Sequence, residues 1–129
     1  GAIALFALGH SVGMLNATFR DEHERAAIEG LKSYVFDIMG VQRTHWDFYQ
    51  GMGWSLSLFL MFLLVVLHFS LPIARANPVL VRPIWYASGL VMIIMAAFCA
   101  RWFFPAPLVM SAVAGAALLI GAWGLKIPN

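Results

Sequence analysis

The sequence RTHWDFYQG at residues 43–51 marks the point where a polar segment of the chain meets a long apolar one. From Phe48 to Ala74 there is no Asp, Glu, Lys or Arg. At a rise of about 1.5 Å per helical residue, such a run is long enough to cross the roughly 30 Å hydrocarbon core of a bilayer. The sequence therefore predicts a membrane-spanning helix here, with Asp47 at the membrane surface.

The composition is that of a membrane protein. Of the 129 residues, 62% are hydrophobic and 11% are charged, whereas soluble domains carry about 25% charged residues. The net charge is +2 and the bases are scattered singly, so the sequence lacks the basic stripe that nucleic-acid binding requires. A single cysteine, Cys99, excludes an intrachain disulfide and a cysteine-based metal site.

Four apolar segments predict four spans, and their short links indicate an antiparallel arrangement. The second span is expected to end at Leu71-Pro72, because proline cannot continue the helical hydrogen-bond ladder. No segment reads as a strand. We therefore predict an all-α integral membrane four-helix bundle that forms one domain over residues 1–129, with spans at about 1–17, 48–71, 84–101 and 105–125.

The polar region before the second span predicts an amphipathic helix over about residues 22–39. Residues 20–47 contain all six acids of the chain. Gly40 is a plausible helix terminator. We expect this helix to lie at the membrane interface between spans 1 and 2, as a connecting helix rather than a lid. Its apolar positions recur at helical spacing: Ala27, Ile28, Leu31, Tyr34, Val35, Ile38 and Met39.

Charged residues near the ends of the spans are the first candidates for a site. In an antiparallel bundle the second and fourth spans begin at the same membrane face, which would bring Asp47 near Arg43 and Arg101. Charges at this depth are costly unless they are paired. We favour a structural clasp over a ligand-binding site, and both stay open. The candidate residues, which include members of an ordinary interfacial aromatic belt, are His10, Arg43, Trp46, Asp47, Tyr49, Gln50 and Arg101.

His10 is the polar residue of the first span. A histidine there is more often a hydrogen-bonded contact between helices than a ligand. A haem held by His10 and His68 is excluded by depth, because the predicted spans place them in opposite leaflets. No HxxxH or HExxH spacing is present. We therefore predict no metal and no cofactor.

Four separated motifs resemble an uncharacterised family of small bacterial membrane proteins. The resemblance covers nearly the whole chain. It implies four membrane spans and a location in the bacterial inner membrane, and it implies no activity. The motifs are Gly9-His10-Ser11, Phe36-Asp37-Ile38-Met39-Gly40, Arg43 followed by Trp46-Asp47-Phe48-Tyr49-Gln50-Gly51, and Phe103-Phe104-Pro105-Ala106-Pro107.

These features favour a non-enzymatic membrane protein, either an accessory subunit of a larger complex or a binder of a lipid-like small molecule. The expected partners are membrane lipids, other membrane subunits or further copies of the chain. Two alternatives stay open. One is a membrane enzyme on a lipid or quinone-like substrate that uses His10 and Asp47 as acid and base, and the other is a small transporter. We expect a multi-pass protein with both termini in the cytoplasm.

Overall fold

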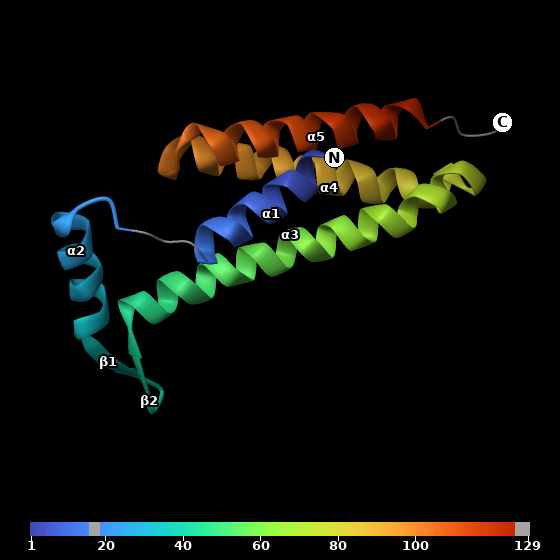
Figure 1. The fold of residues 1–129 in the computed structure, drawn as a ribbon. Coiled ribbons are helices and arrows are strands. Elements are labelled where there is room, and N and C mark those ends of the chain that lie inside the picture. The colour runs from blue at the N-terminus through green and yellow to red at the C-terminus, as the bar shows by residue number, and fades with distance from the viewer. Residues whose placement is uncertain (16–18, 126–129) are drawn as a thin grey trace. The chain divides into compact units, whose positions relative to one another are not determined.

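A computed structural model describes residues 1–15 and 19–125. The chain is predominantly helical, as predicted. Two compact units are present, one of Gly1–Leu8 with Leu60–Asn129 and the other of Gly9–Phe59, and each is described by itself. The elements, labelled in Figure 1, are α1 (Ala2–Leu15), α2 (Glu22–Ser33), β1 (Val35–Ile38), β2 (Val41–Thr44), α3 (His45–Ala76), α4 (Pro78–Trp102) and α5 (Pro105–Gly124).

Three helices, α3, α4 and α5, are long and apolar enough to cross a membrane. The helix α5 lies where the sequence predicts it. The helix α1 is also apolar but has 14 residues, fewer than the roughly 20 that a full span needs. The end of the predicted first span, at residues 16 and 17, lies outside the described residues.

The predicted end of the second helix at Leu71-Pro72 is wrong, because α3 continues through Pro72 to Ala76. A proline inside a helix leaves the carbonyl four residues earlier without its donor. Membrane helices tolerate this where hydroxyl side chains help to satisfy the freed backbone groups. For Pro72 the freed carbonyl is that of His68, and the Ser70 hydroxyl donates to the neighbouring carbonyl, that of Leu67, at 2.7 Å.

The predicted link over residues 72–83 is also wrong, because a single residue, Asn77, separates α3 from α4. Pro78 occupies the start of α4, where its missing N–H costs nothing. Pro83 lies inside the same helix. The backbone N–H of Asn77 donates to the Ile73 carbonyl at 2.7 Å and closes the last turn of α3. Arg75 and Arg82 are therefore helical residues rather than loop residues.

The predicted helix over residues 22–39 is too long, since α2 ends at Ser33 and a β-hairpin follows. The strands β1 and β2 pair antiparallel with Ile38 opposite Val41. The two residues between them, Met39 and Gly40, both have positive φ, of 55° and 83°. Such values are typical of a two-residue hairpin turn. Gly40 thus belongs to the turn of a hairpin and does not terminate a helix.

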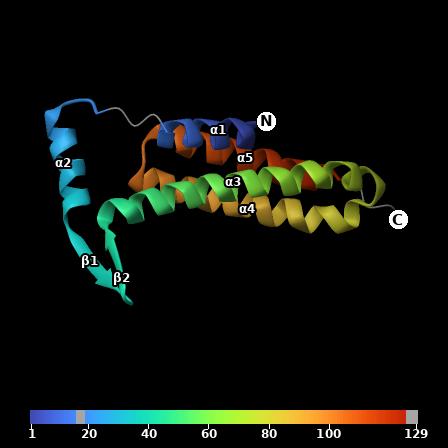
Figure 2. The same ribbon diagram turned by 60° about the horizontal axis from the view of Figure 1, so that its bottom comes forward.

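Within the larger unit, α4 and α5 run antiparallel side by side (Figures 1 and 2). Their backbones approach closely at two glycines. A Cβ added to Gly115 would lie 2.9 Å from the Gly89 carbonyl oxygen, and one added to Gly89 would lie 3.1 Å from the Gly115 oxygen. In α3 and α4, the Trp85 indole donates to the Ser70 hydroxyl at 2.7 Å. Small residues and interhelical hydrogen bonds are the usual means of helix association in lipid.

Candidate functional site

The junction between β2 and α3 is closed by a reciprocal pair of hydrogen bonds. Thr44 is the last residue of β2, and its hydroxyl oxygen accepts from the Asp47 backbone N–H at 3.1 Å. The Asp47 carboxylate in turn accepts from the Thr44 backbone N–H at 2.7 Å and from the Thr44 hydroxyl at 2.9 Å. This is the capping-box geometry, with Asp in the place usually taken by Glu. Asp47 is therefore fixed by Thr44.

These bonds act on the ionisation of Asp47. The helix α3 has 32 residues, or about 48 Å, which exceeds the roughly 30 Å apolar thickness of a bilayer. Asp47 lies in its first turn, before the charge-free segment 48–74 and outside the part that can span. The hydrogen bonds from the Thr44 backbone and hydroxyl, with a smaller contribution from the positive charge of Arg43, lower the pKa of Asp47 below its ordinary value.

A lowered pKa has a definite consequence for the junction. Because the folded form holds the carboxylate ionised, the cap is fully formed above the ordinary carboxyl pKa and is lost as the pH falls through the lowered pKa. We expect the Thr44 amide proton to be protected from exchange, relative to its intrinsic rate at the same pH, while Asp47 is ionised, and to lose this protection once Asp47 is protonated. Amide exchange measured by NMR across this pH range, divided by the intrinsic rate at each pH, checks the prediction, and Asp47→Ala should remove the protection at every pH. Protection that is the same in that variant as in the unmodified chain would contradict it.

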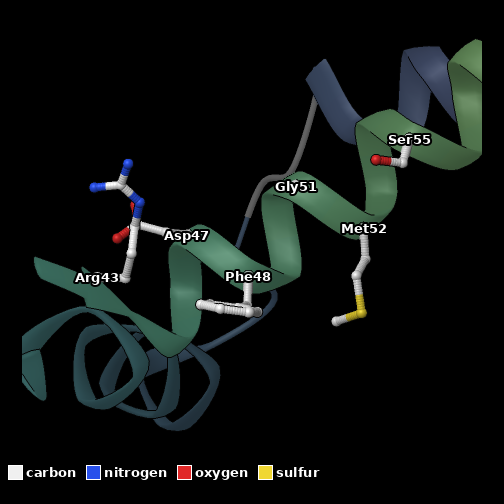
Figure 3. A pocket seen from close by; sticks show the side chains of 6 residues that line it. All are labelled: Arg43, Asp47, Phe48, Gly51, Met52 and Ser55. Carbon is white, nitrogen blue, oxygen red and sulfur yellow. The ribbon is translucent and has the colours of Figure 1, made fainter. Parts of the chain in front are cut away.

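A shallow depression of about 490 Å³ begins at this junction and continues along α3. Its positions on α3 recur at helical spacing and form one stripe. Figure 3 shows Arg43 beside Asp47, with Met52 and Ser55 further along the helix. We call this depression the junction pocket. Its lining residues are Arg43, Asp47, Phe48, Gly51, Met52 and Ser55.

Arg43 and Asp47 do not form the predicted clasp through a hydrogen bond. The Arg43 guanidinium donates to the Gln42 carbonyl oxygen at 2.7 Å, and the carboxylate bonds to Thr44. Arg43 nevertheless lines the junction pocket with Asp47 and lowers its pKa. The pocket thus presents one positive and one negative group at one end, and the side chains of Phe48 and Met52 beyond them.

The remaining candidates of the junction region fall into three environments. Trp46 and Tyr49 stack with ring centroids 5.3 Å apart, and the Lys32 ammonium lies 5.0 Å above the Trp46 ring. Gln50 is half-buried. Arg101 belongs to the other unit, where its guanidinium lies 5.7 Å from the centre of the Trp102 ring. Its pairing with Asp47 stays a prediction.

His10 takes part in a polar cluster that includes a residue the sequence interpretation missed. Its Nδ1 lies 2.9 Å from the hydroxyl oxygen of Ser57, and the Ser11 hydroxyl donates to the same oxygen at 3.1 Å. Ser57 is buried in α3. A serine inside a charge-free apolar helix is a signal of a polar contact, because a polar group in lipid needs a partner, but it does not single out Ser57 among the serines of α3.

The cluster and the junction pocket are separate. Ser57 follows Asp47 by ten residues in the same helix, which is about 15 Å along its axis. General acid–base catalysis requires both groups within hydrogen-bond reach of one substrate. His10 and Asp47 therefore do not form the acid–base pair that the enzyme hypothesis requires.

The larger unit contains a second groove, of about 400 Å³, with an almost wholly apolar lining that includes His68 and Trp85. The Trp85 N–H donates a hydrogen bond to the Ser70 hydroxyl, and the His68 ring makes an edge contact with Phe69.

Within residues 1–15 and 19–125, no group of three or more His, Cys, Asp or Glu side chains is placed to hold a metal ion.

No protein-family model, no curated protein and no solved structure matches the chain. The function must therefore be inferred from the geometry of the junction pocket and of the helices.

Proposed function

We propose that this chain is a small multi-pass protein of the bacterial inner membrane that binds a zwitterionic phospholipid at the junction pocket. In this proposal the four apolar helices form an antiparallel bundle, both termini lie in the cytoplasm, and α2 lies at the interface. The observation that carries the proposal is the junction pocket, where Arg43 and Asp47 line the end nearest the start of α3, and Phe48 and Met52 line the part that follows.

The charges of the junction pocket suit a phospholipid headgroup. The Arg43 guanidinium is a strong donor to phosphate oxygens. The Asp47 carboxylate, ionised through its cap, suits a primary ammonium. Phe48 and Met52 follow within about one to two helical turns, at the depth where acyl chains would begin. The charged end and the apolar side chains beyond it therefore match the order of groups in a phosphatidylethanolamine molecule.

Native mass spectrometry of the protein in mild detergent tests the proposal. An exposed charged contact contributes on the order of 1 kcal/mol, so Arg43→Gln should weaken the binding of both phosphatidylethanolamine and phosphatidylglycerol about fivefold. Asp47→Asn should weaken only the binding of phosphatidylethanolamine, because phosphatidylglycerol has no ammonium group. Bound lipid is measured by titration of each phospholipid and comparison of the lipid-bound masses.

The matched control is Arg75→Gln, which removes an exposed arginine from the other end of α3. It should leave both affinities unchanged. Equal losses in Arg43→Gln and Arg75→Gln would contradict a specific site and indicate general attraction to lipid. Failure of the purified protein to retain any lipid would contradict the proposal as a whole.

An accessory-subunit role is a second candidate, favoured by one surface of α1. Gly9 and Gly13 form a GxxxG pair, and an added Cβ at either would meet no atom within 4 Å. By contrast, the glycines Gly89 and Gly115 are used inside the chain between α4 and α5. An open GxxxG face is the kind of surface on which another membrane helix packs. A protein mass retained in the same native spectra would support this role.

A further inference from the structure

The β-hairpin has one polar and one apolar face. Side chains of directly paired residues point to the same side of an antiparallel hairpin, and successive residues alternate. On the more polar face the register pairs Asp37 with Gln42 and, at the end away from the turn, Val35 with Thr44. On the other face it pairs Ile38 with Val41, and also Phe36 with Arg43. This second face, formed by Phe36, Ile38, Val41 and Arg43, is called the apolar hairpin face.

The apolar hairpin face is turned toward the first turns of α3. The Phe36 ring lies 4.9 Å from the His45 ring and 5.8 Å from the Phe48 ring, centre to centre. Arg43, from the same face, lines the junction pocket together with residues of α3. The apolar hairpin face and the α3 residues that line the junction pocket therefore meet where Arg43 and Asp47 lie.

The tip of the hairpin is apolar and exposed at a conformational cost. Met39 is 97% exposed and has a φ of 55°, a left-handed conformation that costs a non-glycine residue about 1 kcal/mol or more. Asn at this position, before Gly40, would suit the turn better. Ile38 and Val41 beside it are 42% and 44% exposed. A large apolar side chain held outward in an unfavourable conformation indicates an external contact.

The direction of the hairpin indicates what that contact is. In Figures 1 and 2 the hairpin leaves the start of α3 sideways and does not continue the helix axis. If α3 crosses a bilayer, a hairpin in this position extends along the membrane surface. The apolar hairpin face then points toward the lipid that surrounds α3, and Arg43 lies near the phosphate groups. The one cation on this face thus matches the charge of the surface that it would meet.

We propose that the apolar hairpin face and Met39 insert into the lipid headgroup region and anchor the hairpin flat on the membrane. The occupant of this surface is the bilayer itself. The inference rests on the proposed membrane location of α3 and adds a second attachment, beside the spans, that holds the junction pocket at the level of the headgroups.

Site-directed spin labelling in lipid nanodiscs tests this anchor. On a Cys99→Ala background, single labels are placed through Met39→Cys at the tip, Gln42→Cys on the polar face, and Leu58→Cys on an exposed position of α3. The accessibility of each label to oxygen, which concentrates in lipid, is compared with its accessibility to a water-soluble nickel complex. We expect a several-fold higher oxygen-to-nickel ratio at 39 than at 42, and a high ratio at 58.

Each other outcome is decisive. Equal, nickel-accessible labels at 39 and 42 with a high ratio at 58 would overturn the anchor and leave the proposed membrane protein intact. A low ratio at 58 would contradict the proposed function itself. An immobilised label at 39 that is shielded from both reagents would overturn the anchor in favour of a contact with protein.

Discussion

Replacement of Gly115 by valine is expected to cause the largest loss of stability of any single substitution considered for this chain. The new Cβ would lie 2.9 Å from the Gly89 carbonyl oxygen and 2.8 Å from the Ile93 Cδ1 atom. The side chain of Ile93 can move, but the backbone of Gly89 can move only if α4 and α5 separate. Overpacking of this kind costs about 1–3 kcal/mol, and here it would also weaken neighbouring contacts between the two helices.

The loss can be measured as a lower midpoint of thermal unfolding in mild detergent, followed by circular dichroism. Gly124→Val is the matched control, because Gly124 lies in the same helix and an added Cβ there meets nothing within 4 Å. The control should leave the midpoint nearly unchanged. If both variants lower the midpoint equally, the effect would come from adding a side chain anywhere on α5, and not from the close approach of the two helices.

The helices could be predicted from apolar segment length, but their ends could not where proline was involved. For α5 the sequence prediction is accurate, because Pro105 stands at the start of the helix, where proline is favoured. Pro72 and Pro83 lie inside helices instead. A proline rule derived from soluble proteins predicts a helix end at both positions. In apolar surroundings the backbone stays helical, since an open loop would leave more polar groups unsatisfied.

The hairpin was missed because two periodicities fit the same residues. Tyr34, Val35, Ile38 and Met39 match a helical stripe, and Val35-Phe36-Asp37-Ile38 also matches a strand paired across a turn. The aromatic and β-branched residues favour the strand, but no Asn-Gly or Asp-Gly marks the turn. Gly40 was the one local signal. The Asp37 carboxylate accepts from the Gly40 N–H at 3.0 Å, a turn-forming bond that the spacing of these residues permits.

Some features of the candidate site could likewise be predicted from the sequence, and others could not. The charge-free run after Asp47 predicts its position at a membrane surface, and its partner can be read from the sequence as a Thr-x-x-Asp cap, in which Asp47 follows Thr44 by three residues. By contrast, the bond between His10 and Ser57 joins residues 47 positions apart. No local pattern predicts which of several serines in an apolar helix faces a given histidine, because that depends on how α1 packs on α3.

Removal of the Ser57 hydroxyl is expected to have the second largest effect. Ser57 is 5% exposed, and its oxygen serves both His10 and Ser11. Ser57→Ala should lower the free energy of unfolding by about 1–2 kcal/mol, since buried polar groups that lose a partner carry a desolvation cost and hydrogen bonds between membrane helices contribute on this scale. Denaturation by SDS, monitored by tryptophan fluorescence, measures the change.

Ser55→Ala is the control, because Ser55 lies two residues before Ser57 in the same helix and its side chain is exposed. It should be neutral. A double-mutant cycle with Ser11→Ala separates the pairwise bond from general loss of polarity: the two substitutions should be less costly together than the sum of each alone. Additive losses would show that Ser11 and Ser57 are not coupled, and the cluster would then not fix α1 against α3. Phospholipid binding at Arg43 and Asp47 should stay unchanged in Ser57→Ala and Ser11→Ala, because the cluster lies about 15 Å further along the helix.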